Sequence, residues 1–96
     1  MKLCLDEIKV SYRTNANGNV INNFRIIELG DVTIYYSYKT VIGFYTPKHG
    51  IVASENVWGT TTGRHLNLFS NYEERIPREK FLEMLNNIIL DIKIWE

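Results

Sequence analysis

Apolar and polar residues alternate along most of the first two-thirds of the chain. Over residues 8–13 the apolar positions are separated by polar ones, which is the period of a half-buried β-strand. Leu3 and Leu5 are out of phase with that set. We therefore expect a bulge or a short break near residues 6–7, where the register of the strand changes.

The next two strands are separated by turn residues. Residues 15–19 are rich in Asn and Gly, which tolerate a positive φ, and they lead to a second predicted strand over residues 20–29. After Gly30-Asp31 the clearest alternation covers residues 32–38. One face of that strand carries Val32, Ile34, Tyr36 and Tyr38, and the other carries Thr33, Tyr35 and Ser37.

Residues 41–45 and 51–54 predict a hairpin. Pro47 and Gly50 lie in the turn between them, where proline fixes φ and glycine can adopt the left-handed conformation. Together with the preceding segments this makes about five consecutive strands with short connections. An antiparallel meander is the simplest topology for them.

The periodicity disappears over residues 55–75. Residues 65–69 are compatible with a short strand or with a helical turn, and the pattern does not choose between them. A long irregular stretch in a small domain is often functional, and otherwise it is an unrecognised element.

The C-terminal segment has helical periodicity. Pro77 suits the first turn of a helix, and Glu79 complements the helix dipole there. Apolar residues then recur at steps of three and four, which predicts one amphipathic helix over residues 77–93. The apolar positions are Phe81, Leu85, Ile88, Ile89 and Ile92.

These elements predict a single α+β domain over residues 1–96. A mostly antiparallel sheet of about five strands packs one face against the C-terminal helix and leaves the other face free. The composition, 45% apolar with 12% aromatic residues, is that of a packed domain.

Charge and cysteine content narrow the possible functions. Eleven basic residues balance eleven acidic ones, which argues against general polyanion binding because such binding depends on an excess of basic side chains. Cys4 is the only cysteine, which excludes an internal disulfide and suits a reducing compartment. Residues 1–20 lack the apolar core of a signal peptide, and no apolar run is long enough for a membrane span. We therefore expect a cytoplasmic protein that binds no membrane.

Residues 54–67 form the densest run of polar side chains. Three consecutive hydroxyls, Thr60, Thr61 and Thr62, precede Gly63 and Arg64. Glycine and Arg64 would suit a phosphate or a carboxylate, since the backbone can turn its N–H groups toward an anion and the guanidinium forms paired hydrogen bonds. The alternative is a loop whose threonines bond to their own backbone, with Trp58 filling the core. The run is not a phosphate-binding loop of the Walker type, because no lysine follows the second glycine.

Catalysis has weak support in the sequence. His65 and Glu55 could form an acid–base pair, which His49 could join. The spacing places no nucleophile next to a base, and the histidines and the cysteine lack metal-ligand spacing. The sequence predicts a protein that is not an enzyme and that carries no metal or cofactor.

Aromatic residues concentrate on the predicted strands of residues 32–45. Alternation places some of them on the face away from the C-terminal helix, and Tyr35 and Tyr45 are the candidates for that outer face. With Lys39, Lys48 and Arg64 nearby, such residues could stack on bases of a single strand or anchor a protein interface. The alternative is that tyrosine simply fills a half-buried strand face, for which its β propensity is high.

Three motifs in order carry a resemblance over about residues 32–82. They are a Tyr-Ser-Tyr-x-Thr strand at residues 36–40, Ser-Glu-Asn-x-Trp at residues 54–58, and Thr-Thr-Gly-Arg-His-Leu-Asn at residues 61–67. A Pro-Arg-Glu helix start follows at residues 77–79. The set resembles small uncharacterised proteins encoded by phages and other mobile elements. The resemblance implies an accessory protein, conceivably one that counteracts host defence, and it implies no assigned activity.

The first hypothesis is a non-enzymatic protein that binds a host macromolecule, most simply a host protein, through the outer sheet face and residues 55–67. The predicted contact residues are Tyr35, Tyr45, Trp58, Arg64 and His65. The alternative is a nucleotide or phosphate-ligand binder. In it an aromatic residue stacks on the base, and the phosphate is held by Thr60, Thr61, Thr62, Gly63 and Arg64. A module for single-stranded nucleic acid is a further alternative. A homodimer paired through an edge strand stays open.

Overall fold

The computed structural model describes residues 8–11, 13–14 and 17–93. The predicted register break near residues 6–7 and Cys4 lie outside these residues. In chain order the elements are β1 (Ile8–Ser11), β2 (Phe24–Leu29), β3 (Val32–Ser37), β4 (Thr40–Thr46), β5 (Gly50–Ala53), α1 (Thr60–Asn67), the 3₁₀-helix η2 (Tyr72–Glu74) and α2 (Arg78–Lys93).

The strands form one antiparallel sheet in the order β1-β2-β3-β4-β5. The α+β class and the antiparallel sheet are therefore confirmed. Beyond β5, a parallel bridge joins Ser54 to Ile76. The bridge brings the segment before α1 alongside the segment before α2.

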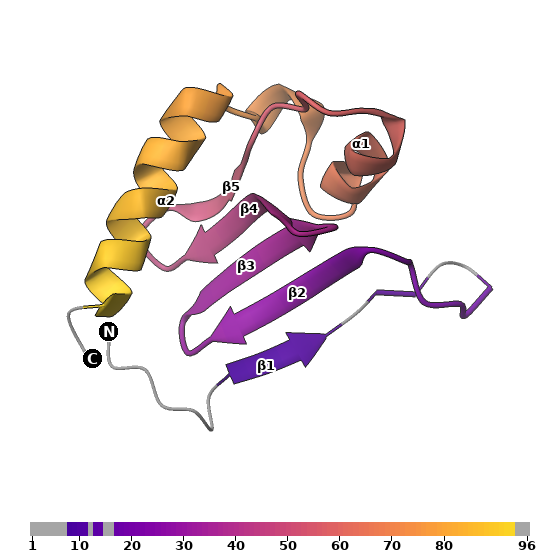
Figure 1. Ribbon diagram of the computed structural model, residues 1–96, viewed down its shortest axis with the longest axis horizontal. Coiled ribbons are helices and arrows are strands. Elements are labelled where there is room, and N and C mark those ends of the chain that lie inside the picture. Colours follow the sequence, from indigo (N-terminus) through magenta and orange to yellow (C-terminus); the bar gives the residue numbers. More distant parts are fainter. Residues whose placement is uncertain (1–7, 12, 15–16, 94–96) are drawn as a thin grey trace.

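Two helices, and not one, pack against the sheet. Neighbouring residues of a strand point to opposite faces. On β5, Ala53 packs in a cluster with Leu66 of α1, whereas Val52 packs in a cluster with Phe81 of α2. The helices therefore cover opposite faces, and Figure 1 shows α2 on one side of the sheet with α1 on the other. The prediction of a single helix, with one sheet face left free, is wrong.

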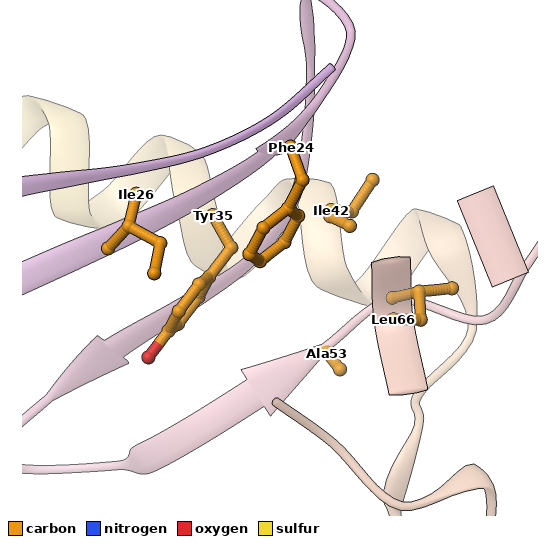
Figure 2. Close-up of a cluster of buried hydrophobic side chains, with 6 residues drawn as sticks. All are labelled: Phe24, Ile26, Tyr35, Ile42, Ala53 and Leu66. Carbon is orange, nitrogen blue, oxygen red and sulfur yellow. The ribbon is translucent and has the colours of Figure 1, made fainter. Parts of the chain in front are cut away.

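The cluster under α1 is built from six buried residues of the sheet and the helix (Figure 2). They are Phe24, Ile26, Tyr35, Ile42, Ala53 and Leu66, with Ile21, Leu68 and Phe69 packed at their margin. The cluster under α2 comprises Phe44, Phe81 and Leu85, with Val41, Val52, Ile76, Met84 and Ile88 at its margin.

A β-bulge on β4 shapes the α1 face. Tyr35 lies opposite Gly43 whereas Tyr36 lies opposite Val41, so Ile42 is the extra residue of the pair of strands. The bulge allows Ile42 to join the buried cluster under α1 although strict alternation would direct it to the α2 face. This irregularity leaves no mark in the hydrophobic pattern.

Gly43 lies directly beneath an aromatic ring. A Cβ atom at this position would overlap Cε2 and Cζ of Phe69 and would lie 3.2 Å from the carbonyl oxygen of Val52. The Phe69 ring cannot shift freely, because it stacks on Tyr35 with 4.1 Å between the ring centroids. Glycine is therefore required here for close packing and not for its backbone freedom.

Gly43→Ala is expected to lower the free energy of unfolding by about 1–3 kcal/mol, the usual cost of overpacking. Urea denaturation measures this loss. Gly59→Ala is the control for steric overlap, because no atom lies within 4 Å of an added Cβ; its own cost is that of replacing the glycine N-cap of α1 by alanine. Combining Gly43→Ala with Phe69→Leu should cost less than the sum of the two single changes. Strict additivity would show that the ring is not what excludes a side chain at residue 43.

Candidate functional site

Helix α1 begins in the segment that the sequence pattern left unassigned. The Trp58 N–H donates to Oδ1 of Asn56, and Nδ2 of Asn56 donates to the carbonyl oxygen of Gly59, at 3.0 Å each. These bonds form a turn that leads into the helix. Gly63 leaves room for this turn, since a Cβ there would lie 2.9 Å from Nδ2 of Asn56. Threonine and glycine are poor helix formers, so propensity concealed the helix.

The inner side of α1 carries a buried polar contact to the sheet. Oγ of Ser37 lies 2.7 Å from Nδ1 of His65 and 3.0 Å from Oγ1 of Thr62. All three residues are buried, and His65 is only 3% exposed. Thr62, His65 and Leu66 share one side of the helix, at steps of three and four residues. This spacing was the sequence signal that would have revealed the helix.

Burial determines the protonation state of His65. Removal from water lowers the pKa of the imidazole below its usual value, while a backbone hydrogen bond with Asn22 acts in the opposite direction. The ring also contacts Phe24, with 5.5 Å between the centroids, and Tyr38, with 6.1 Å. Burial therefore favours the neutral form of His65, and its hydrogen bond to Ser37 fastens α1 to the sheet.

The predicted acid–base pair does not form a shared site. His65 bonds to Ser37, whereas Oε1 of Glu55 accepts the backbone N–H of Arg78 at the start of α2. Ser37 approaches a histidine but is 2% exposed and already bonded to Thr62, so its hydroxyl is not presented to a substrate. Among the described residues no group of three or more His, Cys, Asp or Glu side chains is arranged to hold a metal.

Trp58 lies partly exposed at the surface and does not fill the core. Its ring stacks on the Arg78 guanidinium, with Cζ 4.7 Å from the ring centroid, and the same Cζ is 5.1 Å from the Phe81 centroid. Nη1 of Arg78 also donates to the carbonyl oxygen of Val41. Residues 55–58 are thereby held against α2 by the Glu55 cap and by this stack.

Tyr35 is not on an exposed outer face, which corrects the sequence-based prediction. It is 8% exposed and belongs to the cluster under α1, where Phe69 stacks on its ring. Burial raises the pKa of its hydroxyl. The covering segment, α1 and Phe69, comes from the part of the sequence without periodicity. Alternation correctly placed Tyr35 opposite the α2 face but gave no sign that a second helix covers it.

Tyr45, in contrast, is exposed as predicted. The register aligns Glu28, Thr33, Tyr45 and Ile51 across four strands, and this row lies one step beyond the buried row that contains Tyr35. Tyr45 is 38% exposed and its neighbour Ile51 is 50% exposed. An aromatic and an aliphatic side chain thus lie side by side on the uncovered part of the α1 face.

Three of the predicted ligand-binding residues meet at one hollow. Thr61, Arg64 and His65 of α1 line it together with Leu68 and with two residues before β2, Ile21 and Asn22. Its volume is about 390 Å³. Thr60 is exposed outside this lining, whereas Thr62 turns inward to Ser37. The predicted phosphate-binding residues are therefore divided between the surface and the core.

A model of a protein family of unknown function (DUF8033) matches residues 7–83. The chain belongs to this family. The DUF8033 match covers the sheet, α1, η2 and the first part of α2. No curated protein and no solved structure matches the chain.

Within this DUF8033 chain the three sequence motifs build contacts between elements. Ser37 of the first motif bonds to Thr62 and His65 of the third, while Glu55 and Trp58 of the second contact Arg78. Asn67 at the end of the third motif accepts a hydrogen bond from Nη2 of Arg75 at 2.6 Å. Much of the motif set therefore has a structural role.

Proposed function

We propose that this protein is a non-enzymatic binding protein that engages a host macromolecule, most simply a host protein, as an accessory factor of a phage or mobile element. The origin and a role against host defence rest on the resemblance of the three sequence motifs. The binding mode rests on the surface of the α1 face. No described helix is long and apolar enough to cross a membrane.

The exposed pair Tyr45 and Ile51 carries this proposal. The two side chains lie directly opposite each other on β4 and β5, and their register row is uncovered while the adjoining row is sealed by α1 and Phe69. Tyrosine is enriched at the buried centres of protein interfaces, where it contributes much of the binding energy. Occlusion of the partner's surface would be the mode of action.

The experiment compares wild-type protein with Tyr45→Ala and Tyr72→Ala in quantitative pull-downs from host lysate. Tyr72 is the matched control, because it is an 80% exposed tyrosine on η2 and outside the proposed surface. We expect Tyr45→Ala to lose a host protein that both other samples retain. Identical sets of retained proteins in all three samples would contradict the proposal.

A second candidate function is the binding of a nucleotide or another phosphate ligand. The specific observation in its favour is the hollow of about 390 Å³ shared by Thr61, Arg64 and His65. That volume lies within the usual range for small-molecule sites. This function uses a different surface from the Tyr45–Ile51 pair, so either function can fail without the other.

A further inference from the structure

We infer that the hollow between the β1–β2 connection and α1 takes a nucleoside phosphate, with its phosphate on Arg64 and Thr61 and its base against Ile21 and Leu68. The inference rests on the second candidate function and names its ligand class. It is independent of the partner proposed for Tyr45 and Ile51.

The charge around the hollow favours an anion. The described residues of the surrounding segments, 13–14, 17–23, 38–39 and 60–68, contain the basic residues Arg13, Lys39 and Arg64 and no Asp or Glu. The carbonyl oxygen of Arg13 accepts the Ile21 N–H at 2.8 Å, which places its backbone beside the lining. Arg64 is the only Lys, Arg, Asp or Glu among the residues that line the hollow, so the charge at the lining is positive and favours an anionic ligand.

Arg64 supplies the fixed charge at the hollow. It is exposed on α1, and its guanidinium offers paired donors that match a phosphate group. The neighbouring Thr61 hydroxyl adds a donor. His65 is held by Ser37 and has a lowered pKa, so it adds a polar floor without adding charge at neutral pH.

The apolar side chains that line the hollow suit an uncharged planar group such as a nucleobase. Ile21 and Leu68 are half-buried and pack on the cluster under α1, so both are held in place. The volume of the hollow, about 390 Å³, is large enough for a planar ring system. The exposed amide of Asn22 can exchange hydrogen bonds with the edge of a base.

Tyr38 provides an independent observation next to the hollow. Its φ is +56°, a left-handed conformation that is unfavourable for an aromatic residue and that glycine adopts without strain. The strained turn keeps the half-exposed Tyr38 ring beside His65, with 6.1 Å between the centroids. A positive φ is also what the two-residue turn between β3 and β4 requires. The observation that bears on a ligand is therefore the ring itself, which is half-exposed beside His65 and can stack on a base.

The test is a titration of isotopically labelled protein followed by amide chemical shifts. The probes are the four mononucleotides, inorganic phosphate, and a short single-stranded oligonucleotide. We expect saturable shifts at Asn22, Thr61, Arg64 and Leu68 with at least one mononucleotide at millimolar concentration or below. Inorganic phosphate should shift the same residues much more weakly, because it lacks the base.

Variants locate the site. Arg64→Ala should weaken binding about tenfold or more, since it removes charge-assisted hydrogen bonds. Arg25→Ala is the matched control, because Arg25 is exposed between Phe24 and Ile26 on β2 and so points to the opposite face. Tyr38→Gly should weaken binding severalfold while the protein stays folded, because glycine relieves the strain.

The oligonucleotide distinguishes the source of the ligand. If the oligonucleotide binds more tightly than the mononucleotides and its affinity falls steeply with salt, the natural ligand is a nucleotide unit of a single strand. If the two affinities are equal, the natural ligand is a free nucleotide. Both results support the inference. Three results would overturn it: no saturable shifts at the hollow, equal losses for Arg25→Ala and Arg64→Ala, or phosphate binding as tight as nucleotide binding. None of them bears on the Tyr45–Ile51 surface.

Discussion

Phe24→Ala is expected to lower the free energy of unfolding by about 3–5 kcal/mol, the typical cost of truncating a fully buried aromatic side chain. Domains of this size are generally stable by about 5–15 kcal/mol, so the variant should lose a large part of its stability. Phe24 is completely buried, and its ring contacts Tyr35, His65 and Phe69 at centroid distances of 6.4, 5.5 and 6.1 Å. It therefore connects the sheet to the layer formed by α1 and Phe69.

Urea denaturation monitored by circular dichroism measures this loss. The midpoint should fall while the slope of the free energy against urea stays the same, as expected for a change in stability alone. Leu82→Ala is a suitable control, since Leu82 is 40% exposed on α2. A loss below about 1 kcal/mol for Phe24→Ala, in the range of ordinary surface changes, would show that α1 does not pack on the sheet as described.

His65→Ala is expected to lower the free energy of unfolding by about 2–4 kcal/mol, since it removes a buried hydrogen bond and leaves a cavity. The Nδ1 contact to Ser37 at 2.7 Å is lost, while Ser37 keeps its bond to Thr62. The measurement is again urea denaturation. His49→Ala is the matched control, because His49 is exposed in the β4–β5 turn and bonds to Thr46 through its backbone N–H.

The same variants test the pH dependence. The folded-state pKa of His65 lies below the value of about 6.5 expected for the unfolded chain. Between those two values the unfolded state binds more protons, so the contribution of His65 to stability is complete above pH 6.5 and is lost as the pH falls toward the folded pKa. Wild type and His49→Ala should lose stability over this window. The free energy of unfolding of His65→Ala should depend less on pH over this window. The same pH dependence as in wild type would show that His65 is not buried as a neutral residue.

These structural roles change the interpretation of the motif residues. A His65 or Thr62 substitution that abolishes binding would be ambiguous, since both residues fasten α1 to the sheet through Ser37. Trp58 has a comparable role against Arg78. Exposed residues, Tyr45 on the sheet and Arg64 on α1, are therefore the informative positions for function.

The sequence by itself determined the elements with strong periodicity. Alternation located β3 and the hairpin of β4 and β5 to within one or two residues. The 3.6-residue repeat predicted a helix over residues 77–93, one residue longer than α2. The strand predicted over residues 20–29 was too long, because Asn22-Asn23 forms a turn and β2 begins at Phe24. Asn23 adopts a φ of +64° there. The pattern of apolar and polar residues suffices to locate an element where its residues face core and solvent in a regular order.

Only the tertiary structure decided what covers the second face of the sheet. Thr60 to Asn67 has weak intrinsic helix propensity, and it is helical because Leu66, His65 and Thr62 pack on Phe24 and Ser37 across 25 or more residues of chain. Because Thr62 and His65 are polar, the buried side of this helix forms no apolar repeat in the sequence. The burial of Tyr35, the requirement for Gly43 and the exposure of Tyr45 all follow from where that helix lies.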